Sequence, residues 1–213
     1  MSDAVAEFED AGKQAHAAAL GMWVFVASEL LFFAGFFVLY AAYRVEHPQG
    51  FGVGVETNTL VYGSVNTAIL LVSSYTVALG VHELRRGEVR AAVRLTALTV
   101  LFGACFLTIK GAEYAHHFRE GIYPGGVGAF FTHHPDPGTK IFYTLYFGMT
   151  GLHAIHVTVG MGVLGWLAIR IHRGSVTAQT PHPLALGAVY WHLVDLVWIF
   201  LWPLFYLLPG TSR

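Results

Sequence analysis

Long apolar stretches separated by short polar segments are the dominant pattern of this chain. Five stretches are long enough to cross a bilayer as helices, because about 20 apolar residues span its hydrocarbon core. The pattern predicts an all-α fold, a polytopic membrane protein with one bundle of five transmembrane helices behind a tail at residues 1–19. The predicted spans are residues 20–43, 58–81, 91–112, 141–169 and 184–208.

The segments between the predicted spans carry glycine and proline. Residues 46–57 contain three glycines and one proline and are expected to form a loop. The longest connection, residues 114–139, holds two adjacent histidine pairs, His116–His117 and His133–His134. We expect these histidines to be solvated loop side chains.

One charged residue, Glu29, interrupts the first predicted span. Nine steps of about 1.5 Å place it roughly 13 Å into a hydrocarbon layer about 30 Å thick. An ionised side chain at that depth costs about 2.5–3.5 kcal/mol, so either the acid is protonated or neighbouring helices supply polar partners. Two roles stay open: a neutral acid that only fixes helix packing, and a proton-linked group.

Four polar side chains of three spans are predicted to lie at a similar depth. In the fifth span, His192 and Asp195 share one face at i, i+3, about 12 and 16 Å from its start. In the fourth span, His153 and His156 share a face, and His156 falls near the midplane. The sequence therefore predicts a buried, proton-linked or structural layer of Glu29, His156, His192 and Asp195.

Composition and charge exclude several classes of protein. Only 12% of the residues are charged and 55% are hydrophobic, which is incompatible with an ordinary soluble domain. The net charge of −1 argues against a nucleic-acid partner. The single cysteine, Cys105, permits no intrachain disulfide and no CxxC metal site.

The spacing of the histidines makes a resident metal or haem an unfavourable interpretation. A b-type haem takes an axial imidazole from each of two helices. His153 and His156 lie on one helix and leave only His192 to face them. No metal site is therefore expected, and a stand-alone haem-anchoring or transport protein is a distant alternative.

Lysine and arginine are distributed unequally between the two sides of the membrane. With five spans, residues 1–19, 82–94 and 170–183 lie on one side and carry seven of the twelve basic residues. Four of these are in the short 82–94 loop. The positive-inside rule then predicts a cytoplasmic N-terminus and a C-terminus outside.

Five ordered motifs resemble subunit III of the haem–copper terminal oxidases in its five-helix form. They occur in all five predicted spans. The motifs are LGMWVFVASELLFFAGFF from Leu20, Asn66-Thr67, KGAEYAHHF from Lys110, GLHAIHV from Gly151, and YWHLVDLVWIFLWPLFYL from Tyr190.

The resemblance assigns family positions to individual residues. Glu29 matches the family's membrane-buried glutamate that carbodiimides modify, and Glu113 matches the acid of its EY motif. Lys110 stands where a neutral amide is more usual, which leaves open whether it pairs with Glu113 at i, i+3. The remaining motif positions are Asn66, His153, His156, Trp191, His192, Asp195 and Trp198.

The resemblance also implies a function. It implies an accessory subunit of a respiratory oxidase in the bacterial plasma (inner) membrane, whose partners, subunits I and II, reduce oxygen and pump protons. Haem and copper would then belong to those partners, with no catalytic centre and no directly bound cofactor in this chain. Structural phospholipid is implied in a cleft of the bundle. The electron donor, cytochrome c or quinol, stays open, and an accessory protein of a nitric oxide reductase is the alternative.

Overall fold

The computed structural model describes the backbone of residues 2–208 and the side chains of residues 13, 14 and 16–208. Five of the helices in this part of the chain are long and apolar enough to cross a membrane, which confirms the predicted all-α, five-span architecture. The other two, α2 and α5, are short. The helices are α1 (Ser2–Glu46), α2 (Pro48–Thr57), α3 (Leu60–Arg85), α4 (Val89–Arg119), α5 (Phe130–His133), α6 (Pro137–His172) and α7 (His182–Tyr206).

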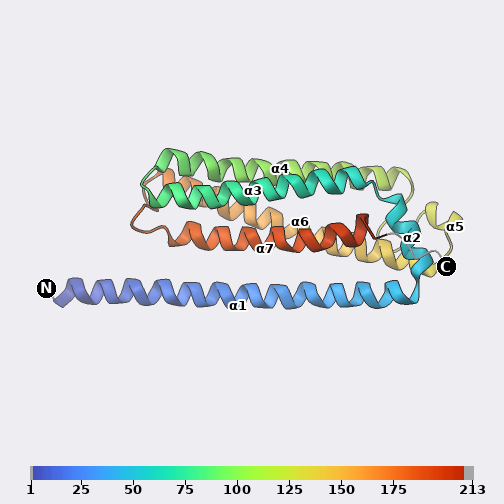
Figure 1. Ribbon diagram of the computed structural model, residues 1–213, viewed down its shortest axis with the longest axis horizontal. Coiled ribbons are helices and arrows are strands. Elements are labelled where there is room, and N and C mark those ends of the chain that lie inside the picture. The colour runs from blue at the N-terminus through green and yellow to red at the C-terminus, as the bar shows by residue number, and fades with distance from the viewer. Residues whose placement is uncertain (1, 209–213) are drawn as a thin grey trace.

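Helices α3, α4, α6 and α7 form the body of the bundle, and α1 lies along one side of it (Figure 1). Helices α2 and α5 are both at the end of the bundle opposite the N-terminus (Figure 1). Only 11% of the apolar stretch of α1 is buried within the chain, against 61% of that of α7. Helix α7 is therefore the central element, and α1 is a peripheral span that packs on α6 and α7.

The first helix is longer than the sequence pattern predicts. The tail predicted at residues 1–19 was given no secondary structure; in the structure it is helical, because α1 begins at Ser2 and continues without interruption to Glu46. The segment before the span is rich in alanine, the strongest helix former, and contains no proline. Local helix propensity therefore extends the helix beyond the apolar stretch.

The prediction of a loop at residues 46–57 is wrong, because most of this segment is helix α2. Pro48 occupies its first turn, where a missing N–H costs nothing. Phe51 is fully buried, and a Cβ added to Gly50 would lie 2.5 Å from the backbone nitrogen of Thr139. The glycines therefore serve close packing of α2 on α6 and not a turn.

The histidines predicted to be solvated in the 114–139 loop differ in their surroundings. Helix α4 extends to Arg119, so His116 and His117 lie on a helix and not in a loop. The imidazole of His117 is 1% exposed, which contradicts its expected solvation, because the rings of Tyr146 and Phe147 pack against it. His116 is exposed and lies 3.3 Å from Glu120.

Aromatic packing and two hydrogen bonds hold α1 to the rest of the bundle at its C-terminal end. Tyr40 is fully buried, with its ring against those of Phe51 and Phe205. Its hydroxyl donates to the carbonyl of Leu204 at 2.5 Å, and Arg44 donates to the carbonyl of Leu208 at 3.0 Å. The end of α1 is thereby attached to the end of α7.

Candidate functional site

Glu29 and His156 meet where α1 packs on α6. Glu29 Oε2 lies 3.1 Å from His156 Nε2, and the two side chains are 20% and 19% exposed. His156 Nδ1 lies 2.8 Å from the carbonyl oxygen of Leu152, one turn earlier on α6. The structure thus gives Glu29 a polar partner within the span, at the edge of the bundle.

The hydrogen bonds of this pair determine how many protons it holds. A carbonyl oxygen only accepts, so Nδ1 of His156 carries a proton and donates it to Leu152. The contact between Nε2 and Oε2 then needs one further proton between the two atoms. With that proton on Glu29, the pair is a neutral acid beside a neutral imidazole. With the proton on His156, the pair is a carboxylate beside an imidazolium. Both forms have no net charge, which lowers the cost of placing the pair inside a membrane.

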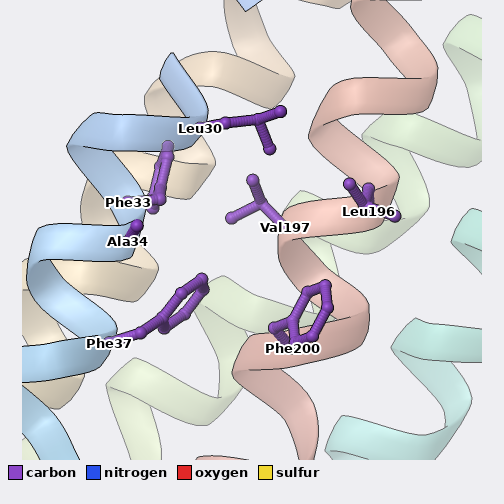
Figure 2. A pocket seen from close by; sticks show the side chains of 7 residues that line it. All are labelled: Leu30, Phe33, Ala34, Phe37, Leu196, Val197 and Phe200. Atoms are coloured by element: carbon purple, nitrogen blue, oxygen red, sulfur yellow. The ribbon is translucent and has the colours of Figure 1, made fainter. Parts of the chain in front are cut away.

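An apolar cavity of about 280 Å³ adjoins this pair between α1 and α7. Figure 2 shows side chains from the two helices facing each other across it, without a polar group among them. Phe33 lines the cavity and also packs edge-on against the imidazole of His156, with the ring centroids 5.4 Å apart. The other lining residues are Leu30, Ala34, Phe37, Leu196, Val197 and Phe200.

A second polar site is a buried cluster of Lys110, Glu113, Tyr146 and Tyr206, contributed by α4, α6 and α7. Lys110 Nζ donates to Glu113 Oε2 at 3.0 Å, to the Tyr146 hydroxyl at 2.8 Å and to the Tyr206 hydroxyl at 2.6 Å. Both tyrosines donate in turn to Glu113 Oε1, at 2.8 and 2.6 Å. The i, i+3 pairing of Lys110 with Glu113 that the sequence left open is therefore confirmed.

This cluster satisfies every charge and donor that it buries. The ammonium group has three donors, and all three are used. It also lies 4.5 Å from the ring centroid of Tyr146, within the range of a cation–π contact. A closed, neutral network that joins three helices is suited to holding them together, because each member is costly to leave unpaired.

His192 and Asp195 lie on the side of α7 that faces α3. Nδ1 of His192 lies 2.5 Å from the Ser74 hydroxyl, and the Asp195 side chain is buried at 3% exposure. In the described part of the chain, no hydrogen bond connects them with Glu29 or His156. Of the four residues in the predicted layer, the structure brings Glu29 and His156 together, whereas His192 and Asp195 lie on the opposite side of α7 without a hydrogen bond to each other.

The other motif positions are interior side chains. Trp191 donates to Ser73 at 2.9 Å, and Trp198 donates to Thr67 at 3.0 Å, so both tryptophans fasten α7 to α3. His153 is fully buried with its ring against that of Trp198. Asn66 is also fully buried. Neither the amide of Asn66 nor the imidazole of His153 has a hydrogen-bond partner among the described residues.

Sequence reasoning missed Ser74, Tyr146 and Tyr206. Tyr206 belongs to the last motif string, but only the fold shows that it reaches Glu113. Ser74 is uncharged, and nothing in the sequence distinguishes it from the other small polar residues of its span. Among residues 13, 14 and 16–208, no three His, Cys, Asp or Glu side chains form a group that could hold a metal ion.

Comparison with known proteins places these sites in a family context. The family model described as cytochrome c oxidase subunit III matches residues 6–209. The quinol oxidase subunit 3 of Bacillus spizizenii is 31% identical over 195 residues, covering 89% of this chain and 86% of the relative. The cytochrome c oxidase subunit 3 of Thermostichus vulcanus is 32% identical over 190 residues, with the same coverages of 89% and 86%. The cytochrome bo(3) ubiquinol oxidase subunit 3 of Pseudomonas aeruginosa is 30% identical over 188 residues, covering 88% and 83%.

Proposed function

The chain belongs to the cytochrome c oxidase subunit III family, and from that premise we propose that its pair of Glu29 and His156 supports proton uptake by the oxidase to which it is bound. As a family member it is an accessory subunit of a haem–copper oxidase, an oxidoreductase complex, and assembles with other oxidase subunits. The observation that carries the proposal is the 3.1 Å contact between Glu29 Oε2 and His156 Nε2.

The partners that we propose are the catalytic subunit I and subunit II. Haem and copper belong to these partners in this proposal, and the present chain contributes no redox centre. Relatives of both donor classes are similarly close, at 31% and 32% identity, so identity does not separate a quinol oxidase from a cytochrome c oxidase. The proposed location is the bacterial plasma membrane, with the N-terminus in the cytoplasm and the C-terminus outside, as the distribution of basic residues predicts.

Structural phospholipid is the ligand that we propose for the apolar cavity between α1 and α7. Its lining is entirely hydrocarbon and aromatic, which suits an acyl chain, and it is partly open at the side of the bundle. An acyl chain in this cavity would cover Phe33, whose ring packs on His156, and would keep water away from the proton-sharing pair. Ala34→Trp should fill the cavity and reduce the phospholipid that co-purifies with the complex. Ala27→Trp, on the same helix but outside the cavity, is the matched control.

Substitutions at Glu29 test the functional role of the pair. Glu29→Gln keeps the shape of the side chain but cannot hold the shared proton, so the complex should assemble normally and yet inactivate after fewer turnovers or take up protons more slowly. Glu29→Ala should in addition weaken the association of α1 with α6. The measurements are oxygen consumption followed to inactivation and proton pumping in vesicles. If Glu29→Gln equals wild type in both, and Glu29→Ala only lowers assembly, the carboxyl is a packing element.

A further inference from the structure

His192 lies in a groove on the opposite side of α7 from the pair of Glu29 and His156. The groove is a cavity of about 270 Å³ between α3 and α7, lined by small apolar side chains, with Arg85 as the only charged residue among them. Along α7 it extends from Ala185 to His192, about 10 Å at the rise of a helix. His192 therefore lies at the inner end of a groove whose other end, at the last turn of α3, carries an arginine.

The two ring nitrogens of His192 face different surroundings. Nδ1 lies 2.5 Å from the Ser74 hydroxyl, and this is the one hydrogen bond of the Ser74 side chain among the described residues. Nε2 makes no hydrogen bond there, and the residue as a whole is exposed on the groove side. A neutral imidazole holds one proton, on either nitrogen, so His192 can accept a proton at one nitrogen and release one from the other.

Asp195, one turn further along α7, is a buried carboxyl group without a hydrogen-bond partner. Neither of its oxygens makes a hydrogen bond in the described part of the chain. The Ser74 hydroxyl is a polar neighbour of this carboxyl, but the contact falls outside hydrogen-bond geometry. In this respect Asp195 differs from Glu29 and Glu113, which each have a basic partner. An unpaired ionisable group at membrane depth points to a functional site.

We propose that His192, Ser74 and Asp195 form a proton relay that leads from the α3–α7 groove to a buried proton-storage site. A proton enters at Nε2 of His192, and the proton on Nδ1 passes to Ser74 Oγ. The original hydroxyl proton of Ser74 passes to the carboxylate of Asp195, which no hydrogen bond prevents from turning toward it. One proton has then moved to Asp195, and His192 is again neutral with its proton on Nε2.

The charged and titratable groups on the neighbouring helices are not connected to the relay of His192, Ser74 and Asp195. On α1 and α6, Glu29 and His156 are occupied with each other at 3.1 Å. His153 of α6 packs against Trp198, and Arg85 of α3 lies at the far end of the groove. No described hydrogen bond joins any of them to Asp195. The relay therefore goes beyond the role proposed for Glu29 and does not depend on it.

Hydrogen–deuterium exchange followed by infrared spectroscopy tests the relay in the intact oxidase complex in lipid vesicles. All variants carry Glu29→Gln, so that Glu29 contributes no carboxyl band. The C=O band of protonated Asp195 is identified by its loss in Asp195→Asn. Its exchange after transfer to deuterated water should be on the order of 100-fold slower in Ser74→Ala and in His192→Gln, the scale typical of losing a positioned proton-transfer group.

Two further variants separate the relay from a structural role. Ser74→Thr keeps the hydroxyl and should restore exchange to within a few-fold of the parent. Ser64→Ala removes a half-buried serine of α3 outside the relay and should change nothing. The proposal is overturned if Asp195→Asn removes no protonated carboxyl band, or if Ser74→Ala and His192→Gln exchange at the rate of the parent.

Discussion

Breaking the buried pair of Lys110 and Glu113 should destabilise the bundle far more than removing both charges together. Lys110→Met leaves the Glu113 carboxylate with the two tyrosine hydroxyls and no cation. Glu113→Gln leaves the ammonium of Lys110 without its carboxylate. In each case an uncompensated charge stays inside the bundle, because the two side chains are 3% and 1% exposed.

The size of the expected loss of stability follows from the fact that every charge in the cluster is paired. Removing one partner of a buried ion pair costs about 3–5 kcal/mol, whereas replacing both by neutral groups of similar volume is often nearly neutral. Each single variant should therefore shift the unfolding equilibrium by roughly 100-fold to a few thousand-fold. In the double variant the amide oxygen of the new glutamine can still accept from Tyr146 and Tyr206, so most of this loss should be recovered.

The assay is a double-mutant cycle on the unfolding of the chain in mixed micelles, with its retention in the assembled complex as a second measure. Strong coupling, with the double variant more stable than either single variant, is the expected result. Single variants that each lose less than about 1 kcal/mol, or a double variant that loses their sum, would show that the cluster is not a closed network.

Two further predictions concern packing and topology. Gly50→Ala should cost about 1–3 kcal/mol, measured by thermal unfolding, because its Cβ would be forced against the backbone of α6; Gly35→Ala, where nothing lies within 4 Å, is the control and should be close to neutral. In a Cys105→Ala background, Arg86→Cys should be shielded from an impermeant maleimide in intact cells while Thr132→Cys should react, and labelling of position 86 from outside would reverse the predicted orientation.

The number and type of the spans could be predicted from the sequence because apolar length alone decides them. Their ends could not, since helix propensity and polar end residues carry α1 and α4 beyond the apolar stretch. Helix α2 was missed because glycine is ambiguous: the same residue permits a turn and permits two helices to touch. Only the neighbouring backbone at Thr139 identifies the second use for Gly50.

Depth along a helix could be counted from the sequence, but the direction in which a side chain faces could not. Counting steps placed Glu29 and His156 at a common level, and the structure has them in contact at 3.1 Å. The same count placed His192 and Asp195 at that level too. These two residues, however, lie on the side of α7 that faces α3, away from Glu29 and His156. Rotation of a central helix about its own axis depends on packing from several sides, and one sequence contains no direct measure of it.

The contact between Glu29 and His156 also has a consequence for biosynthesis. The two residues are 127 positions apart, and at about 5–20 residues per second the ribosome needs roughly 6–25 s to add the second after the first. The first span therefore enters the bilayer carrying an acid whose partner does not yet exist. During that interval the remaining apolar residues of α1 must outweigh the insertion cost of Glu29, and the helix becomes fixed in place only when the fourth span arrives.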